Sequence, residues 1–201
     1  MTPTPANLVL YNGPTSPFAR MTFVVGTELG IEFTDQTIDV YNAEFLDKLN
    51  PLRQIPTLAI DGKTAIYDSR SIFAYFDAIS DKPSILPGED FEQATRISLF
   101  LSLTDACLQY RMASVLPEAD RSEVSIEKLL VRINRTLDFI ERNAPKTTSG
   151  PLRLEQIVAA CTLEYIDYRY STEWRNRCPQ LDSWVNQFSN RPSMETSRPA
   201  E

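Results

Sequence analysis

The sequence predicts a small α/β domain followed by an all-helical domain. Up to residue 79, short strand-like runs alternate with helical runs, whereas after residue 90 only the helical period returns. The intervening stretch "SDKPSILPGED" (80–90) is broken by proline and glycine, as linkers often are. We therefore expect one domain over residues 1–80, a linker over 81–90 and a helical domain over 91–201.

The first part predicts the element order β-α-β-α-β-β-α, which implies a mixed sheet. "NLVLY" (7–11) has the pattern of a strand and stops at Asn-Gly-Pro. From Ser16 to about Leu29, apolar residues recur at helical spacing, and Gly30 closes the run. The other expected elements are a strand within 32–40, a short helix at 42–50, strands at 56–60 and 64–67 around a turn at 61–63, and a helix at 68–79.

The second part predicts helices at about 91–114, 124–143, 154–170 and 180–189. No run reaches the roughly 18 apolar residues of a membrane span, so we expect no membrane partner. The first eleven residues lack the basic region and the long apolar core of a secretory signal.

Composition argues against several classes of function. Apolar residues make up 42% and charged residues 23% of the chain, as in globular proteins. The three cysteines form no CxxC pair, so we expect neither a disulfide framework nor a metal site, and a cytoplasmic location. The net charge of −7 and the scattered basic residues argue against nucleic acid as a partner. The chain has no histidine, so its chemistry must use hydroxyls, carboxylates, backbone amides or a bound cofactor.

The first candidate site lies in "SPFA" (16–19), where the expected first helix begins. Pro17 suits the first helical position, which makes Ser16 the N-cap. The free amides of a helix start favour an anion, and a hydroxyl beside them can donate to a thiolate. Redox proteins with a similar opening often hold Cys-Pro-x-Cys here, so Ser16 and Ala19 replace both thiols. Plain capping by Ser16 is the alternative interpretation.

The second candidate site is "NPLRQIPTL" (50–58), in which Pro56 begins a strand. If the Ile55–Pro56 bond were cis, the Ile55 backbone would present its N–H and C=O to an extended peptide. An ordinary strand start is the alternative, because only about 5–6% of X–Pro bonds are cis.

The third candidate site is "YDSRSI" (67–72), where Asp68 and Ser69 open a helix directly after a strand. The amides and Ser69 could bind a ligand carboxylate, and Asp68 could bind a ligand ammonium. A simple helix cap is again the alternative interpretation.

Together these three motifs resemble the N-terminal thioredoxin-like domain of cytosolic glutathione transferases, specifically bacterial members with a serine at the active site. "NPLRQIPTL" is similar to that family's N-P-x-x-x-[VI]-P-x-L, and "YDSRSI" to its [ED]-S-x-x-I. The tail "RPSMETSRP" (191–199) resembles the family's R-P-S-x-x-x-T-R-P, and "IVAACTLEYIDYRY" (157–170) resembles the core helix of its second domain. The resemblance covers nearly the whole chain.

The resemblance implies that glutathione is the co-substrate and binds at these motifs. Pro56 would be the cis proline, Ile55 would pair with the cysteinyl part, Asp68 and Ser69 would hold the γ-glutamyl end, and Gln54 would lie near the glycyl end. Ser16 would activate the thiol, while Tyr11, Thr15 and Phe18 would complete the binding site. Tyr11 and Thr15 stay open as alternatives to Ser16 for thiol activation.

The implied activity is attack of the glutathione thiolate on a small hydrophobic electrophile, with peroxide reduction or ether cleavage as further possibilities. Helix amides lower a thiol pKa from roughly 8.5, so no histidine is needed. The family also implies a homodimer and suggests a role in detoxification. The alternative is a non-catalytic member of the fold that mediates protein–protein interaction, as in the stringent-starvation type. A thiol oxidoreductase is disfavoured because both cysteines are absent.

Other residues have less specific interpretations. Cys161 is expected in the core, and Cys107 and Cys178 are not expected to be catalytic. Residues that could line a pocket for the second substrate are Tyr110, Arg111, Met112 and Leu116, and Tyr165, Tyr168 and Tyr170 resemble core or interface aromatics. Arg20 could support a partner or the active-site field, or it could be solvated. Arg153 and Gln156 replace the family's Ser/Thr and Asp, so we expect the reciprocal cap of that helix to be lost, at a cost of about 1 kcal/mol.

Overall fold

The computed structural model describes residues 7–199. Residues 1–6 and 200–201, where the expected domains begin and end, lie outside the described residues. Residues 1–6 are also part of the segment that is not expected to be a secretory signal. The described chain divides into two compact units. One contains the residues up to Leu86 together with those from Arg191 onward, and the other contains Pro87–Asn190. The first unit holds a sheet with helices and the second is helical, so the predicted fold class is confirmed.

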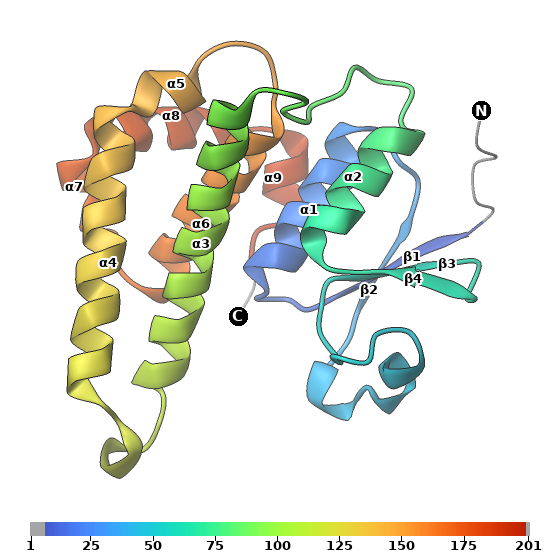
Figure 1. The fold of residues 1–201 in the computed structure, drawn as a ribbon, viewed down its shortest axis with the longest axis horizontal. Coiled ribbons are helices and arrows are strands. Elements are labelled where there is room, and N and C mark those ends of the chain that lie inside the picture. Colours follow the sequence, from blue (N-terminus) through green and yellow to red (C-terminus); the bar gives the residue numbers. More distant parts are fainter. Residues whose placement is uncertain (1–6, 200–201) are drawn as a thin grey trace. The chain divides into compact units, whose positions relative to one another are not determined.

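A four-stranded mixed sheet forms the centre of the first unit. Its strands are β1 (Leu8–Asn12), β2 (Thr34–Thr37), β3 (Thr57–Ile60) and β4 (Thr64–Ile66), in the order β2-β1-β3-β4. β1 pairs in parallel with β2 and antiparallel with β3, and β3 pairs antiparallel with β4. Helices α1 (Pro17–Glu28) and α2 (Ser69–Ile79) pack together against this sheet (Figure 1).

The segment between β2 and β3 differs from the expected short helix. It forms two 3₁₀ helices, η1 (Val40–Asn42) and η2 (Glu44–Lys48). Asp39 caps η1, accepting from Tyr41 N at 3.1 Å and from Asn42 Nδ2 at 2.5 Å. These local bonds hold the chain in a tight turn shortly after β2, and 3₁₀ helices commonly run only a few residues.

The C-terminal segment also differs from expectation, since it belongs to the contact unit of the sheet rather than to the helical one. It contains a five-residue helix, α9 (Pro192–Thr196), which packs on α1 (Figure 1). Arg191 donates from Nε and Nη2 to the Glu28 carboxylate at 2.8 and 2.6 Å, which ties the segment to the end of α1.

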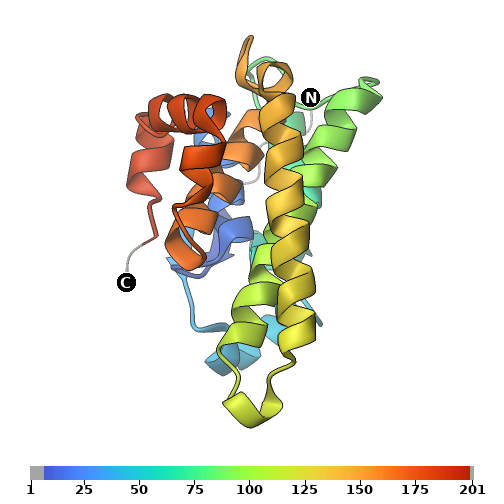
Figure 2. The same ribbon diagram turned by 90° about the vertical axis from the view of Figure 1, so that its left-hand side faces the viewer.

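The helical unit contains four long helices that agree with the predictions to within one residue at each end. They are α3 (Phe91–Ser114), α4 (Glu123–Arg142), α6 (Leu154–Arg169) and α8 (Pro179–Phe188). α3 and α4 lie side by side and antiparallel in both views (Figures 1 and 2). Three short helices were not predicted: η3 (Glu118–Asp120), α5 (Ala144–Thr148) and α7 (Trp174–Arg177).

Helix α6 is buried along most of its length and forms the centre of this unit. Cys161 is 1% exposed and Tyr165 is 3% exposed, which confirms the expectation that both belong to the core. Within residues 7–199, none of the helices combines the length and the apolar content that a membrane span requires.

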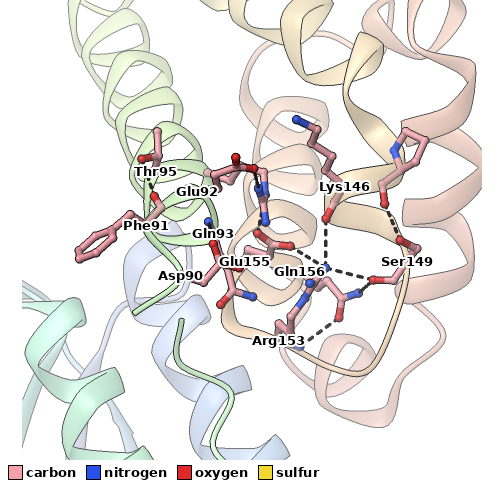
Figure 3. A network of polar contacts seen from close by, with 12 residues as sticks. Asp90, Phe91, Glu92, Gln93, Thr95, Lys146, Ser149, Arg153, Glu155 and Gln156 are labelled. Atoms are coloured by element: carbon pink, nitrogen blue, oxygen red, sulfur yellow. Dashed lines mark hydrogen bonds and ion pairs between the residues drawn. The ribbon is translucent and has the colours of Figure 1, made fainter. Parts of the chain in front are cut away.

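The cap at the start of α6 is only half lost, so the expectation that the whole reciprocal cap is absent was wrong. Gln156 Oε1 accepts from the Arg153 backbone N–H at 3.1 Å (Figure 3). The arginine side chain has no acceptor atom, so it cannot complete the other half. Its Nη2 instead donates to Lys146 O at 3.0 Å and to Ser149 O at 3.1 Å, which holds α5 and the following turn against the start of α6.

A fully buried carboxylate, Glu155, lies in the first turn of α6. Its Oε2 is 2.8 Å from Arg96 Nε on α3, and its Oε1 is 2.8 Å from Arg153 Nη2. Burial raises the pKa of Glu155, and the two guanidinium groups oppose that shift. The ion pairs join α3 to α6, so this network is explained by the packing of the helical unit.

Candidate functional site

The strand register brings the three predicted motifs to one edge of the sheet. Tyr11 at the end of β1 pairs with Thr57 at the start of β3, and Leu58 pairs with Ile66 at the end of β4. The segments that follow β1, precede β3 and follow β4 therefore emerge at the same edge. Ligands of α/β sheets commonly bind at such an edge.

Ser16 is the N-cap of α1, as predicted. Its backbone is extended, and its Oγ accepts from Ala19 N at 3.3 Å. Pro17 occupies the first helical position. The first-turn amides have no carbonyl of the helix to bind, so they give this end of α1 a partial positive charge. The Ser16 hydroxyl proton can still be donated, because accepting from Ala19 uses only an oxygen lone pair.

Gly13 packs the α1 entry loop directly against Ile55. Its N–H donates to Asn12 Oδ1 at 2.6 Å, and its carbonyl accepts from Ser16 N at 3.1 Å. A Cβ at position 13 would lie 2.4 Å from Ile55 Cδ1. The loop that leads into the first motif is thus packed against the second motif, and a side chain at Gly13 would require Ile55 to shift.

The second motif contains the cis bond that the family resemblance implied, between Ile55 and Pro56. Both residues precede the first paired residue of β3, Thr57, so the Ile55 backbone lies outside the ladder. Pro56 is buried, Ile55 is half-buried and Gln54 is exposed.

The second motif is organised by Asn50, which sequence reasoning missed as a site-supporting residue. Asn50 is 1% exposed, and its Nδ2 donates to Gln54 O at 3.1 Å and to Thr57 Oγ1 at 2.9 Å. Its Oδ1 accepts from Leu52 N at 3.0 Å. The available signal was an Asn-Pro pair opening a loop, since asparagine often bonds to nearby backbone.

The third motif forms the predicted helix start. Asp68 is the N-cap of α2 and accepts from Arg70 N at 2.9 Å through Oδ1. Its other oxygen lies 3.6 Å from Arg70 Nη1, and the side chain is 63% exposed. Ser69 is 5% exposed. The Tyr67–Asp68 peptide bond is also cis.

Tyr11, Thr15 and Phe18 lie at the same edge, at the end of β1 and the beginning of α1. All three are half-buried. The Tyr11 ring packs on Phe45 of η2 with 5.2 Å between centroids. The structure thus brings Tyr11, Thr15 and Ser16 together as the alternatives for thiol activation.

Arg20 is buried, so its interpretation as a solvated arginine was wrong. It is 6% exposed, its Nε donates to Ser197 Oγ at 3.2 Å, and its Nη2 donates to Met194 O at 3.2 Å. Both acceptors belong to the C-terminal segment, whose docking on α1 was not predicted.

The cysteine side chains are separated from water. All three are buried, and burial raises the pKa of Cys107 to about 12 and that of Cys178 to about 11. Both side chains therefore stay as thiols near neutral pH, in agreement with the expectation that neither is catalytic.

The helical unit contains a cavity of about 410 Å³ between α3, α4 and α5. Its apolar walls include Leu99, Phe100 and Ile140, and Phe91 and Phe139 lie at its exposed side. The residues expected to line a pocket for a second substrate do not line this cavity. Of these, Met112 is 54% and Leu116 42% exposed, near the far end of α3.

Aromatic side chains of the helical unit form ring contacts. The Tyr170 ring packs edge-on against Tyr110 with 5.1 Å between centroids, and Arg169 lies 4.0 Å above the Tyr168 ring. Among residues 7–199, no group of three or more acidic, cysteine or histidine side chains could hold a metal ion.

Comparisons with known proteins agree on one family. Residues 15–79 match the model of the glutathione S-transferase N-terminal domain. The chain is 28% identical to YibF, an uncharacterised GST-like protein of Escherichia coli K12, over 92% of this chain and 95% of YibF.

Solved structures give the same result. A glutathione transferase family member from Pseudomonas fluorescens Pf-5, crystallised with bound glutathione, is 29% identical with a TM-score of 0.91, covering 97% of this chain and all of that one. A glutathione S-transferase from Methylobacillus flagellatus KT, with glutathione bound, is 26% identical with a TM-score of 0.91, covering 96% of this chain and all of that one.

Proposed function

We propose that this chain, which is similar to glutathione S-transferases, binds glutathione at the sheet edge described above and transfers it to a small hydrophobic electrophile. The observation that carries the proposal is the meeting of three ligand-competent segments at one edge. The contact between Gly13 and Ile55 joins the α1 start to the segment before β3, and β4 leads into Asp68 at the same edge.

Each part of glutathione has a chemical counterpart at this edge. The γ-glutamyl ammonium would meet the Asp68 carboxylate, which has free acceptor capacity beyond its capping bond. The γ-glutamyl carboxylate would meet Ser69 and the first amides of α2. The cysteinyl backbone would pair with Ile55, whose position before the ladder supports this role. Gln54 is exposed beside it and could donate to the glycyl carboxylate.

Thiol activation would take place at the start of α1. The Ser16 hydroxyl would donate to the glutathione sulfur, and the first-turn amides would favour the thiolate over the thiol. The thiolate then attacks the electrophilic atom and forms a thioether bond, while the displaced electron pair stays on the electrophile or leaves with a leaving group. Ser16 is the better-placed donor because it adjoins the free amides at the start of α1. The ring of Tyr11 is half-buried and packs on Phe45 instead.

The test is calorimetric titration of glutathione into the wild-type protein and two variants. Asp68→Asn keeps a capping oxygen for α2 but removes the charge, so we expect glutathione affinity to fall about tenfold while the melting temperature stays close to wild type. Ser16→Ala should retain most of the affinity but lose the thiolate absorbance of bound glutathione at neutral pH.

Two outcomes would contradict the proposal. Absence of binding to the wild-type protein at millimolar glutathione would remove the transferase assignment and favour a scaffold that binds protein partners. Equal affinity of wild type and Asp68→Asn would move the γ-glutamyl end away from α2.

We further propose that the protein is a homodimer, as the family resemblance implies. The supporting observation is an exposed apolar area where α3 and α4 border the same cavity, with Phe91 79% and Phe139 50% exposed. Patches of this kind commonly mark association surfaces.

A further inference from the structure

The cavity of about 410 Å³ in the helical unit combines apolar walls with two cationic side chains. Phe100 and Ile140 are 1% and 3% exposed, so these walls belong to the packed core. Arg96 on α3 and Lys146 on α5 line the same cavity. Sites for small molecules commonly have this character, with mostly apolar walls and a few polar groups that orient the ligand.

Arg96 is held in place by a buried carboxylate and keeps donors to spare. Its Nε donates to Glu155 Oε2 at 2.8 Å, and Glu155 is fully buried. Its Nη1 lies 3.8 Å from Glu92 Oε2, beyond hydrogen-bond distance, and the Glu92 side chain is 81% exposed. Within residues 7–199, Arg96 Nη2 has no hydrogen-bond or ion-pair partner. Because a guanidinium carries five N–H donors, Arg96 can still bind a ligand.

Lys146 supplies the second positive charge from α5. Arg153 Nη2 donates to Lys146 O at 3.0 Å, which holds this turn of α5 beside the start of α6 (Figure 3). The Lys146 ammonium has no partner in the part of the chain that the structure describes. The cavity therefore has a fixed guanidinium and an unpaired ammonium in its lining.

The charges that line the cavity favour an anion. Arg96 and Lys146 contribute two positive charges, against one negative charge on Glu92. Glu155 does not line the cavity and already pairs with Arg96. Asp90 does not line it either, and its carboxylate caps the start of α3. A single carboxylate in the cavity would bring the lining charge to zero, whereas a cation would add to the excess.

We propose that this cavity binds a small amphiphilic carboxylate, whose charged group meets Arg96 and Lys146. The hydrocarbon part of the ligand packs on Leu99, Phe100 and Ile140, and its transfer from water supplies much of the affinity. The charge-assisted hydrogen bonds of the guanidinium select the acid over neutral molecules of the same shape. All residues of this site belong to the helical unit, so the inference does not depend on glutathione binding at the sheet edge.

The experiment is calorimetric titration of 4-phenylbutyrate, with 4-phenylbutan-1-ol as a neutral probe of the same carbon skeleton. The wild-type protein should bind the acid about tenfold more tightly than the alcohol. Since the chain carries a net charge of −7, unspecific binding would favour the alcohol instead.

Two lysine variants test the charged end of the site. Lys146→Gln should lower the affinity for the acid about fivefold and leave the affinity for the alcohol unchanged. Lys128→Gln is the matched control, because Lys128 is also exposed and carries the same charge but does not line the cavity. The control should bind both probes as the wild type does.

A third variant tests the apolar end. Leu99 is half-buried in the cavity lining, so Leu99→Trp should fill the space and abolish binding of both probes. Its melting temperature shows whether the variant is folded, and the lysine variants decide the question if it is not.

Several results would overturn the inference. Equal affinity of the wild type for acid and alcohol would contradict an anion site, and equal losses in Lys146→Gln and Lys128→Gln would assign the effect to overall charge. Undiminished binding in a folded Leu99→Trp would place the acid elsewhere. Absence of binding to the wild type at millimolar 4-phenylbutyrate would also overturn it, and would leave a second copy of the chain, packed on Phe91 and Phe139, as the occupant.

Discussion

At the residue scale, the packing of Gly13 against Ile55 at the candidate site gives a direct prediction. Gly13→Ala places a methyl group where Ile55 Cδ1 lies 2.4 Å away. Because Cδ1 is the end of a flexible side chain, we expect a loss of only about 1 kcal/mol in the free energy of unfolding, measured in urea. Glutathione affinity should fall several-fold, since Ile55 must shift.

The matched control for Gly13→Ala removes the atom that it would strike. Valine lacks Cδ1, so the double variant Gly13→Ala with Ile55→Val should bind glutathione more tightly than Gly13→Ala alone. If the double variant is no better, the effect comes from the Gly13 backbone rather than from the contact with Ile55.

Residues whose roles depend on local rules were predictable from the sequence. Ser16 and Asp68 are N-caps because each precedes a helical pattern and carries a short acceptor side chain. The burial of Arg20 was not predictable, since its acceptors Met194 and Ser197 come 174 and 177 residues later. The crowding at Gly13 is likewise a tertiary contact, and "NGP" by itself indicates only a turn.

At the scale of the element, α1 and α9 predict a specific acid sensitivity. The hydrogen bond from Arg191 lowers the pKa of Glu28, and the Ser193 hydroxyl adds to this against the cost of burial. The unfolded chain therefore takes up a proton on Glu28 more readily than the folded one. The stabilisation is complete above the ordinary pKa of about 4.5 and is lost as the pH falls through the lower folded value.

The corresponding measurement is urea unfolding between neutral pH and about pH 3. Arg191→Gln removes the cause of the shift, so its stability should fall less steeply with acid than that of wild type. If the free energy of unfolding falls equally steeply with acid in the two proteins, Glu28 and Arg191 do not interact in solution.

Some helices could be predicted from the hydrophobic period of the sequence, whereas others form only through contacts with distant parts of the chain. The four long helices of the helical unit were predicted because their apolar stripes extend over several turns. The helices α5, α7 and α9 have only four or five residues, too few for a periodic signal. They depend on partners from elsewhere in the chain, as α9 depends on Glu28 and Arg20.

At the scale of the whole molecule, the fold class could be predicted but the course of the chain end could not. A change from alternating to purely helical patterns separates the two parts in sequence. Residues 191–199 continue the helical half in sequence but join the unit of the sheet, because Glu28 and Arg20 supply partners there.

The proposed homodimer gives the last prediction. If the apolar area on α3 and α4 is the association surface, Phe139→Asp should convert the protein from a dimer to a monomer, because a carboxylate would be buried without a partner. Phe139 is 50% exposed, so the isolated chain should tolerate the change with little loss of stability. Sedimentation velocity at micromolar protein measures the mass directly.

Val115→Asp is the control, since Val115 is also 50% exposed but follows the far end of α3, roughly 36 Å along the helix from Phe91. A wild-type monomer, or dimers that survive in Phe139→Asp, would contradict association through this surface.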